Sequence, residues 1–250
     1  MKFITLPDTK EHRLTFYLAM EEYVARRLDE PDAFFLWQVA PTVIFGRNQV
    51  AGNEVNLDYC RQHAISVYRR KSGGGCVYAD EGNLMWSFVT ANASVGFAFN
   101  RFLGMVLLVL RKMGIEGVGT RHNDIMLPPL SPTDSPPQAG GQWRKVCGTA
   151  CYHLNDHCIV HGTMLYDTDM QHMTNAISPP REKLRRKGVE SVRQRITLLK
   201  DYTTLTLDEV KSLIRETLCD GERQLTASDV AAIEALEQSY QDETFIKLYN

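Results

Sequence analysis

The sequence predicts an α+β fold with a mixed, largely antiparallel sheet flanked by helices. Strand-like and helical segments do not alternate regularly along the chain, which argues against a doubly wound parallel sheet. Residues 145–152 and 158–165 have the alternating pattern of strands and enclose a turn at 154–157, so we expect an antiparallel hairpin there. The 250 residues, 44% of them hydrophobic, suffice for the core of a single domain over residues 1–250.

The first half of the chain contains one predicted helix and several predicted strands. Residues 12–28 have the spacing of an amphipathic helix, and its apolar face carries one polar exception, Glu21. Residues 34–39 and 42–45 are predicted strands joined across a proline. Residues 64–68 alternate as another strand.

The second half begins with an apolar helix predicted over residues 99–113, which should end at Gly114 after a basic last turn. Residues 127–143 hold five prolines and two closing glycines, so we expect a surface loop insert there. Residues 200–250 should close the chain with two helices. The first is near 206–219, with Thr206 and Glu209 as a capping box, and the second is near 226–240, with Thr226 or Ser228 as its cap.

Composition limits the classes of function. A formal net charge of -2 gives no overall basic surface for nucleic acid, and no apolar run is long enough to span a membrane. The N-terminus has no long apolar segment of the kind found in secretory signals. The six cysteines do not have the spacing of a secreted disulfide framework, so we expect reduced thiols and a cytoplasmic location.

A loop of basic residues and glycines is the most informative segment. Residues 69–75 read Arg-Arg-Lys-Ser-Gly-Gly-Gly and lie between two predicted strands. Glycines let the backbone lie directly against a ligand, and arginines bind phosphate or carboxylate oxygens. Neither G-x-x-x-x-G-K-[ST] nor G-x-G-x-x-G is present, which excludes the two common phosphate loops. The alternative, a flexible hairpin tip, explains the glycines but not the paired arginines.

Four other segments accompany this loop: Gly46-Arg47-Asn48-Gln49, Asn123-Asp124-Ile125, Lys145-Val146-Cys147-Gly148-Thr149-Ala150 and His161-Gly162-Thr163. Their order and spacing resemble the lipoate–protein ligase A family, whose pattern is R-R-x-S-G-G-G-x-V-[YF]-H-D-x-G-N, N-D-[IL], K-[VIF]-x-G-[ST]-A and H-G-[ST]. Residues 188–195 also resemble a family segment. The chain departs from the pattern at Ala79, where the family has His, and at Arg121-His122, which replaces Gly-Arg.

The resemblance implies the catalytic fold shared by biotin and lipoate ligases and class II aminoacyl-tRNA synthetases. It also implies that lipoate or octanoate is activated with ATP and Mg²⁺ to an acyl-adenylate. The acyl group then passes to a lysine of a lipoyl domain, in an E2 subunit of a 2-oxoacid dehydrogenase or in the glycine-cleavage H protein. Neither nucleic acid nor a membrane is expected as a partner.

The length of the chain opens an alternative within the same family. Many family ligases continue into a further small domain, whereas this chain ends at Asn250. The resemblance therefore implies a catalytic domain without that C-terminal accessory domain. A separate accessory protein, or transfer from a preformed adenylate or a thioester donor, is the alternative.

The resemblance also assigns site residues. Lys145 is the implied catalytic residue. Its compact ammonium on a flexible side chain can stay in contact with the lipoate carboxylate oxygen while that oxygen becomes part of the adenylate linkage. Asp124 is the implied Mg²⁺ contact, since Mg²⁺ favours a carboxylate together with phosphate oxygens, although Asn123-Asp124 alone also fits a simple turn. Leu14, Tyr17, Leu18, Trp37 and Phe45 suit either a slot for the apolar tail or plain core. The implied contacts with nucleotide or substrate are Arg70, Ser72, Gly73, Gly74, Gly75, Cys76, Val77, Tyr78, Asn83, Asn123, Asp124, Lys145, Gly148, His161 and Gly162.

Three other functions would use different chemistry: a transferase with a cysteine nucleophile, a metal-binding module and a biotin ligase. Transferases of the same fold use a cysteine nucleophile, but Ser178-Pro179-Pro180 stands at one family position for it and Asn123 near the other. A metal module would use Cys147, Cys151, His153, His157, Cys158 and His161, but no standard zinc spacing occurs. The G-R-G-R loop of biotin ligases is absent.

The basic stretch 181–195 is by default a solvated face. In the family context, this stretch could instead close over the adenylate or attract an acidic acceptor domain.

Overall fold

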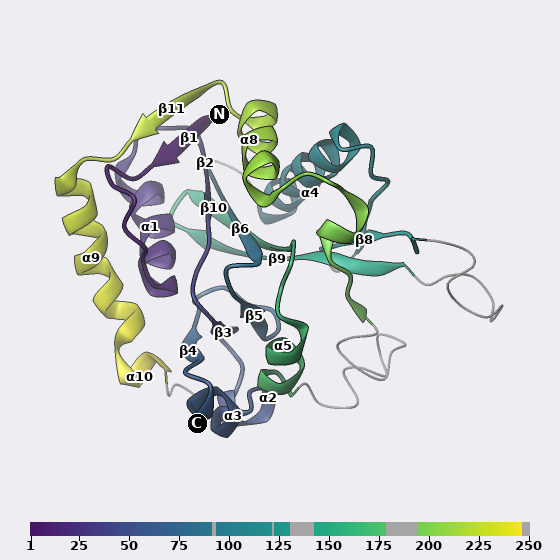
Figure 1. The fold of residues 1–250 in the computed structure, drawn as a ribbon. Helices are drawn as coiled ribbons and strands as arrows, with labels where there is room; N and C mark the ends of the chain where they lie inside the picture. Colours follow the sequence, from purple (N-terminus) through teal and green to yellow (C-terminus); the bar gives the residue numbers. More distant parts are fainter. Residues whose placement is uncertain (92–93, 122, 131–142, 179–194, 247–250) are drawn as a thin grey trace.

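The computed structural model describes residues 1–91, 94–121, 123–130, 143–178 and 195–246 (Figure 1). The part of the predicted loop insert at 131–142 and the part of the basic stretch at 179–194 lie outside these described residues.

The described residues form one large sheet and one small sheet, together with helices. The large sheet is largely antiparallel, as predicted, since only the β11–β1 and β1–β2 pairs are parallel. The hairpin predicted around residues 154–157 is confirmed as β9 and β10. In sheet order the strands are β11 (Gly221–Gln224), β1 (Lys2–Thr5), β2 (Asp32–Trp37), β6 (Asn83–Ala91), β10 (His157–Leu165), β9 (Arg144–Leu154), β8 (Asp124–Leu127) and β7 (Val118–Gly119).

The small sheet excludes the interpretation of the glycine loop as a hairpin tip. Its order is β4 (Ser66–Arg69), β3 (Thr42–Phe45), β5 (Val77–Ala79), with β3 parallel to β4 and antiparallel to β5. The loop does connect two strands, as predicted, but they pair with β3 and not with each other. The loop is therefore not a hairpin tip, because it crosses the end of a third strand.

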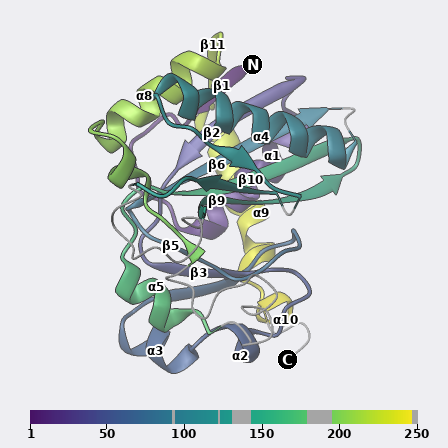
Figure 2. The ribbon, with the colours of Figure 1, turned by 90° about the vertical axis from the view of Figure 1, so that its right-hand side faces the viewer.

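Helices cover both faces of the large sheet (Figures 1 and 2). Alternate residues of β2 and β6 enter two different cores, because successive side chains of a strand point to opposite faces. One core contains α4 (Val95–Lys112) and α8 (Leu207–Leu218). The other contains α1 (Leu14–Arg27), α9 (Ala227–Gln241) and part of the small sheet. The elements that complete the fold are α2 (Ala51–Glu54), α3 (Leu57–Gln62), α5 (Met170–Ala176), the 3₁₀ turn η1 (Leu199–Tyr202) and α10 (Glu243–Ile246).

The local signals for helix ends are largely confirmed. Gly114 has φ +75 after α4, as its role as a stop requires. Thr206 and Glu209 form the predicted capping box of α8, and Thr226, not Ser228, caps α9. The start of α4 differs from the prediction by four residues, because Ser94 accepts a hydrogen bond from Phe97 N and begins the helix earlier.

All six cysteines are free thiols. In the part of the chain that the structure describes, every helix is too short or too polar to cross a membrane.

Candidate active site

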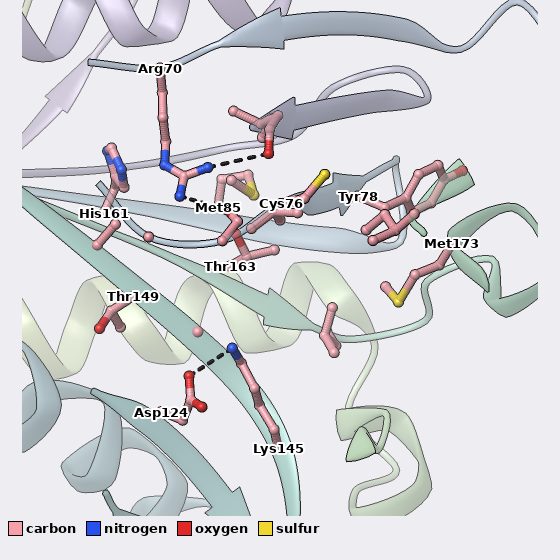
Figure 3. A pocket seen from close by; sticks show the side chains of 18 of the residues that line it. Arg70, Cys76, Tyr78, Met85, Asp124, Lys145, Thr149, His161, Thr163 and Met173 are labelled. Atoms are coloured by element: carbon pink, nitrogen blue, oxygen red, sulfur yellow. Dashed lines mark hydrogen bonds and ion pairs between the residues drawn. The ribbon is translucent and has the colours of Figure 1, made fainter. Parts of the chain in front are cut away.

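A cavity of about 350 Å³ lies between the large sheet and the glycine loop. Figure 3 shows Lys145 and Asp124 across this cavity from Arg70 and Cys76, with His161 towards one end and Tyr78 and Met173 towards the other. The cavity is lined by Leu18, Trp37, Ile44, Glu54, Arg70, Gly74, Gly75, Cys76, Val77, Tyr78, Met85, Asp124, Lys145, Gly148, Thr149, Ala150, His161, Thr163, Leu165, Met173, Ile177, Arg195 and Ile196.

A β-bulge brings Lys145 onto the cavity side of β9. In the β8–β9 register Ile125 pairs with Cys147 but Met126 pairs with Lys145, so Val146 is an extra residue. An extra residue reverses the alternation of side chains, and Lys145 therefore shares a face with Gly148 instead of Cys147. The bulge explains how a lysine and a glycine three positions apart on one strand both line the cavity.

An acidic side chain fixes the ammonium of Lys145. Lys145 Nζ lies 2.7 Å from Asp124 Oδ1, and Arg195 Nη2 donates to Asp124 Oδ2 at 2.6 Å. Lys145 and Asp124 are 21% and 11% exposed, so the pair lies at the cavity wall and is partly shielded from solvent. Gly148 leaves room for this arrangement, because a Cβ there would lie 2.3 Å from Lys145 Nζ.

The glycine loop and the polar loop after β3 (residues 46–49) each need a glycine at one point. Gly74 has φ +92, which an L side chain rarely adopts. A Cβ on Gly46 would lie 2.3 Å from the Gly74 carbonyl oxygen, so the polar loop after β3 and the glycine loop pack backbone to backbone.

Arg70 holds this shape from inside. Its guanidinium donates to Ser72 Oγ at 2.9 Å and to three carbonyls, those of Ile44, Gly73 and Gly75, at 3.2, 2.6 and 2.7 Å. Burial lowers the pKa of Arg70 to about 10, which still leaves it protonated at neutral pH. Arg70 lines the cavity, and these bonds use four of the five N–H groups of its guanidinium to order the loop.

A buried chain of hydrogen bonds continues from Arg70 to α1. Ser72 Oγ lies 2.7 Å from His161 Nε2, and His161 Nδ1 lies 3.0 Å from Glu21 Oε2. Ser87 Oγ donates to Glu21 Oε1 at 2.6 Å and accepts from Trp37 Nε1 at 2.8 Å. Glu21 is fully buried, and a buried carboxylate requires such partners.

Ten of the predicted ligand contacts line the cavity, and five do not. The ten are Arg70, Gly74, Gly75, Cys76, Val77, Tyr78, Asp124, Lys145, Gly148 and His161. Of the five, Ser72 and Gly73 are bonded to Arg70 as described. Asn83 donates to the Tyr78 carbonyl and accepts from Thr168, so it orders the turn before β6. Asn123 has φ +58 and its N–H donates to the Thr120 carbonyl at 3.0 Å, which forms a turn, while its own carbonyl accepts from Thr149 Oγ1.

Gly162 is the fifth, and it lies against the core. A Cβ on Gly162 would lie 2.7 Å from Phe102 Cζ, so its role is to let α4 approach the sheet. Of the residues considered for an apolar slot, Leu18 and Trp37 line the cavity. Leu14 and Phe45 are plain core, and Tyr17 stacks on Trp37 at 4.8 Å.

Several residues that line the cavity, or that bond to its lining, were not assigned from the sequence. Arg195 ends the basic stretch 181–195, for which a solvated face and closure over the adenylate are both expected, and its guanidinium reaches Asp124. Glu21 was visible as a polar residue on an apolar helix face, which was the available signal for a buried partner. Met173 lies on α5 and Ile177 follows it directly; neither carries a sequence signal, because isolated apolar residues are usually part of the core.

Asp124, the predicted Mg²⁺ contact, is paired with two cations in this structure. Both carboxylate oxygens of Asp124 already contact a cation, and a divalent ion there would lie next to two positive charges. Within residues that the structure describes, no group of three or more His, Cys, Asp or Glu is arranged to hold a metal ion.

The cysteines on the hairpin do not suit nucleophilic catalysis. Burial raises the pKa of Cys147 and of Cys151 to about 12, so both thiols stay protonated at neutral pH. Cys147 also lies on the face of β9 opposite Lys145, because of the bulge. Cys76 is the cysteine that lines the cavity.

Two proteins named as lipoate-protein ligases match most of the chain. It is 33% identical over 244 residues to lipoate–protein ligase 1 of Staphylococcus aureus, covering 94% of this chain and 70% of that protein. It is 31% identical to a lipoate-protein ligase of Bacillus subtilis, covering 85% of this chain and 60% of that protein. The chain thus spans less than two thirds of the second relative.

Two solved structures have the same fold. A bi-partite lipoate protein ligase from Thermoplasma acidophilum, described with its E2 lipoyl domain, superposes with a TM-score of 0.80 at 25% identity, covering 98% of this chain and 95% of that one. A lipoate-protein ligase A bound with ATP gives a TM-score of 0.77 at 25% identity, covering 99% and 98%. The sequence profile of the lipoyl protein ligase A/B catalytic domain matches residues 14–219, which is most of the chain. The chain therefore belongs to the lipoyl protein ligase A/B catalytic domain family.

Proposed function

We propose that this protein is a lipoate–protein ligase, which activates lipoate or octanoate with ATP and transfers the acyl group to a lysine of a lipoyl domain. The observation that carries the proposal is the position of Lys145, whose ammonium is fixed by Asp124 across one cavity from the glycine loop. Relatives named as lipoate-protein ligases and a related structure bound with ATP support it.

Two parts of the cavity suit the two substrates. Near His161 the wall is formed by Leu18, Trp37 and Met85, which suits the apolar chain and dithiolane ring of lipoate. Residues 75–78 line the cavity and continue into β5, the end strand of the small sheet. Backbone N–H and C=O groups at such an edge are suited to the hydrogen-bonding edge of an adenine ring.

The reaction runs in two steps. A carboxylate oxygen of lipoate attacks the α-phosphorus of ATP, the new O–P bond forms, and the bond to pyrophosphate breaks. The acceptor lysine, as a neutral amine, then attacks the acyl carbon; a C–N bond forms, the bond to AMP breaks, and the amine releases a proton to solvent. Lys145 stabilises the negative charge that develops on the carboxylate and phosphate oxygens in both steps.

We expect Mg²⁺ to enter on the phosphate oxygens of ATP, since Asp124 is already paired. Acceptors would include lipoyl domains of dehydrogenase E2 subunits and the glycine-cleavage H protein. The six free thiols fit a reducing compartment such as the cytoplasm. Residues 1–250 would act as one catalytic domain.

The second candidate function is transfer alone, with the first step dependent on a separate accessory chain. The observation that favours it is the related ligase of Thermoplasma acidophilum, which is described as bi-partite. In that case this protein would use preformed lipoyl-adenylate and would release little pyrophosphate from ATP by itself.

Intact-mass analysis of a purified lipoyl domain separates these functions. One reaction contains the protein, lipoate, ATP and Mg²⁺, and a parallel reaction contains synthetic lipoyl-adenylate. Gain of lipoyl mass with ATP identifies a complete ligase, and gain with the adenylate alone identifies the transfer function. No gain in either reaction contradicts both and directs the search to thioester donors, with Cys76→Ala as the variant that tests a thiol intermediate.

Lys145→Ala tests the residue that carries the proposal. We expect modification with ATP to fall by at least about 100-fold, because the charge that the reaction needs is removed from a fixed position. Lys211→Ala is the matched control, since Lys211 lies on α8 and pairs with Asp208 away from the cavity. Wild-type activity in Lys145→Ala would refute the assignment of this residue.

A further inference from the structure

Four consecutive side chains of the glycine loop, Arg69 to Ser72, each bond to a different part of the fold. Arg70 bonds to the loop itself and Ser72 to His161, as described above. Arg69 and Lys71 reach the two C-terminal helices, α9 and α10, which lie beyond residue 219, where the family profile ends. Those two contacts connect the C-terminal segment to the cavity.

Lys71 is held by a residue of α1 and a residue of α9 together. Lys71 Nζ lies 2.5 Å from Glu22 Oε1 and 4.3 Å from the centre of the Tyr240 ring. Tyr240 OH donates to the same Glu22 oxygen at 2.5 Å. The three groups therefore form one cluster, in which a carboxylate oxygen binds an ammonium and a phenol, and the phenol ring faces the ammonium.

The cluster is built inside the protein. Glu22 is 2% exposed and Tyr240 1% exposed, so neither can exchange its partner for water. A buried carboxylate is unfavourable unless it is paired and hydrogen-bonded. Burial also raises the pKa of Tyr240 well above its usual range, so its hydroxyl remains a donor to Glu22.

Arg69 makes a second connection, to α10. Its Nε and Nη2 donate to the Ile246 carbonyl at 3.3 and 3.1 Å. Its Nη1 donates to the carbonyls of Arg47 and Gln49 at 2.6 and 2.8 Å. One fully buried arginine thus fixes the end of α10 and the polar loop after β3 to the same point of the glycine loop.

We propose that α9 and α10 are a brace for the glycine loop, and that Glu22, Lys71 and Tyr240 are positioning residues for the ligand that this loop binds. None of the three lines the cavity. They act through the backbone that follows Lys71, whose groups at 74–78 do line it. The effect on ATP rests on the proposed function, whereas the effect on loop order does not.

The chain offers a matched control at the same helix pair. Tyr23 on α1 donates its hydroxyl to Asp229 on α9, at the opposite end of α9 from Tyr240. Tyr23→Phe and Tyr240→Phe each remove one hydroxyl between α1 and α9 and keep the ring. A general loosening of the two helices would affect both variants alike.

The first measurement is hydrogen exchange of the amides of Arg47 and Arg70 in the full-length protein without ligand. These amides donate to the Ser72 and Phe45 carbonyls at 2.9 and 3.0 Å, so their exchange reports the order of the glycine loop. We expect exchange in Tyr240→Phe and Lys71→Met to be roughly 2- to 12-fold faster than in Tyr23→Phe, the range that one hydrogen bond of ordinary net strength gives. Lys71→Arg should restore slow exchange, because an arginine can pair with Glu22 and stack on Tyr240. Equal exchange in Tyr240→Phe and Tyr23→Phe would overturn the brace.

The second measurement is the KM for ATP and kcat in lipoyl-domain modification. In Tyr240→Phe and Lys71→Met we expect the KM for ATP to rise by roughly 2- to 12-fold, as the exchange rate does, with kcat nearly unchanged. In Tyr23→Phe the KM for ATP should stay within about twofold of the wild-type value. A change in kcat alone would contradict positioning of the nucleotide. If the wild-type protein binds no ATP, the proposed function fails, and the exchange result still decides whether the brace exists.

Discussion

Gly148→Ala adds one methyl group beside Lys145 and tests whether the position of that lysine matters, not merely its presence. The new Cβ would lie 2.3 Å from Lys145 Nζ and 2.6 Å from Cε, whereas ordinary contact begins at 3.4 Å. Lys145 must therefore move by about 1 Å or more, and its contact with Asp124 at 2.7 Å is lost. Misplacement by 1 Å costs about 100-fold in rate, which corresponds to about 2.7 kcal/mol of transition-state stabilisation.

The same substitution should leave the fold nearly as stable as before. The atoms in the way are the end of a flexible side chain, and Gly148 has no positive φ that an alanine would strain. Loss of a partly exposed ion pair costs about 0.2–1 kcal/mol, and Gly→Ala returns about 0.4–1 kcal/mol by restricting the unfolded chain. We therefore expect Tm to change by no more than about 4 °C.

The assay is kcat for modification of a lipoyl domain, read by intact mass, with Tm from calorimetry on the same samples. Gly119→Ala is the control, since its Cβ would meet Leu103 Cδ1 at an ordinary 3.5 Å on an exposed strand. A Gly148→Ala protein with kcat within threefold of wild type would refute the argument from the position of Lys145. A large fall in Tm would refute the argument that only the lysine end moves.

Two further predictions concern residues outside the cavity. Cys147→Ala should keep the wild-type kcat. In the wild-type protein, Cys147 should resist alkylation at pH 7–8, as read by peptide mass mapping. Because the pKa of Cys147 is raised to about 12, the reactive thiolate forms, and labelling increases, only as the pH approaches that value. Labelling of Cys147 at neutral pH would contradict its burial. Thr206→Ala removes the capping box of α8 and should lower Tm by about 2–4 °C with unchanged activity, since a cap contributes about 1 kcal/mol. An unchanged Tm would show that α8 is held by packing alone.

The parts of the fold that the sequence predicted well are those with local signals. The capping box of α8 and the β9–β10 hairpin are encoded within a few residues, and both were confirmed. The placement of β3 between β4 and β5 was not predictable, because β3 pairs with strands on either side of the loop through contacts distant in sequence. Sheet order depends on such pairings and not on local pattern.

The candidate site shows the same division. Lys145 was singled out from its motif, but the β-bulge that aims it into the cavity has no sequence signal, because Val146 reads as an ordinary strand residue. Glu21 was visible as a polar residue on an apolar face. Its partner His161 is 140 positions away, so the sequence indicated that a buried pair exists but not which pair.

The arginines of the glycine loop show that the side chains of a binding motif can also order its backbone. A basic loop with three glycines suggests side chains that grip phosphate. In this structure, Arg69 and Arg70 donate mainly to backbone carbonyls, and Lys71 and Ser72 are bonded to buried groups. A chain segment with three glycines loses much conformational entropy on ordering, so it needs many bonds to keep one shape. The side chains supply that order, which leaves the backbone at Gly74, Gly75 and Cys76 to face the cavity.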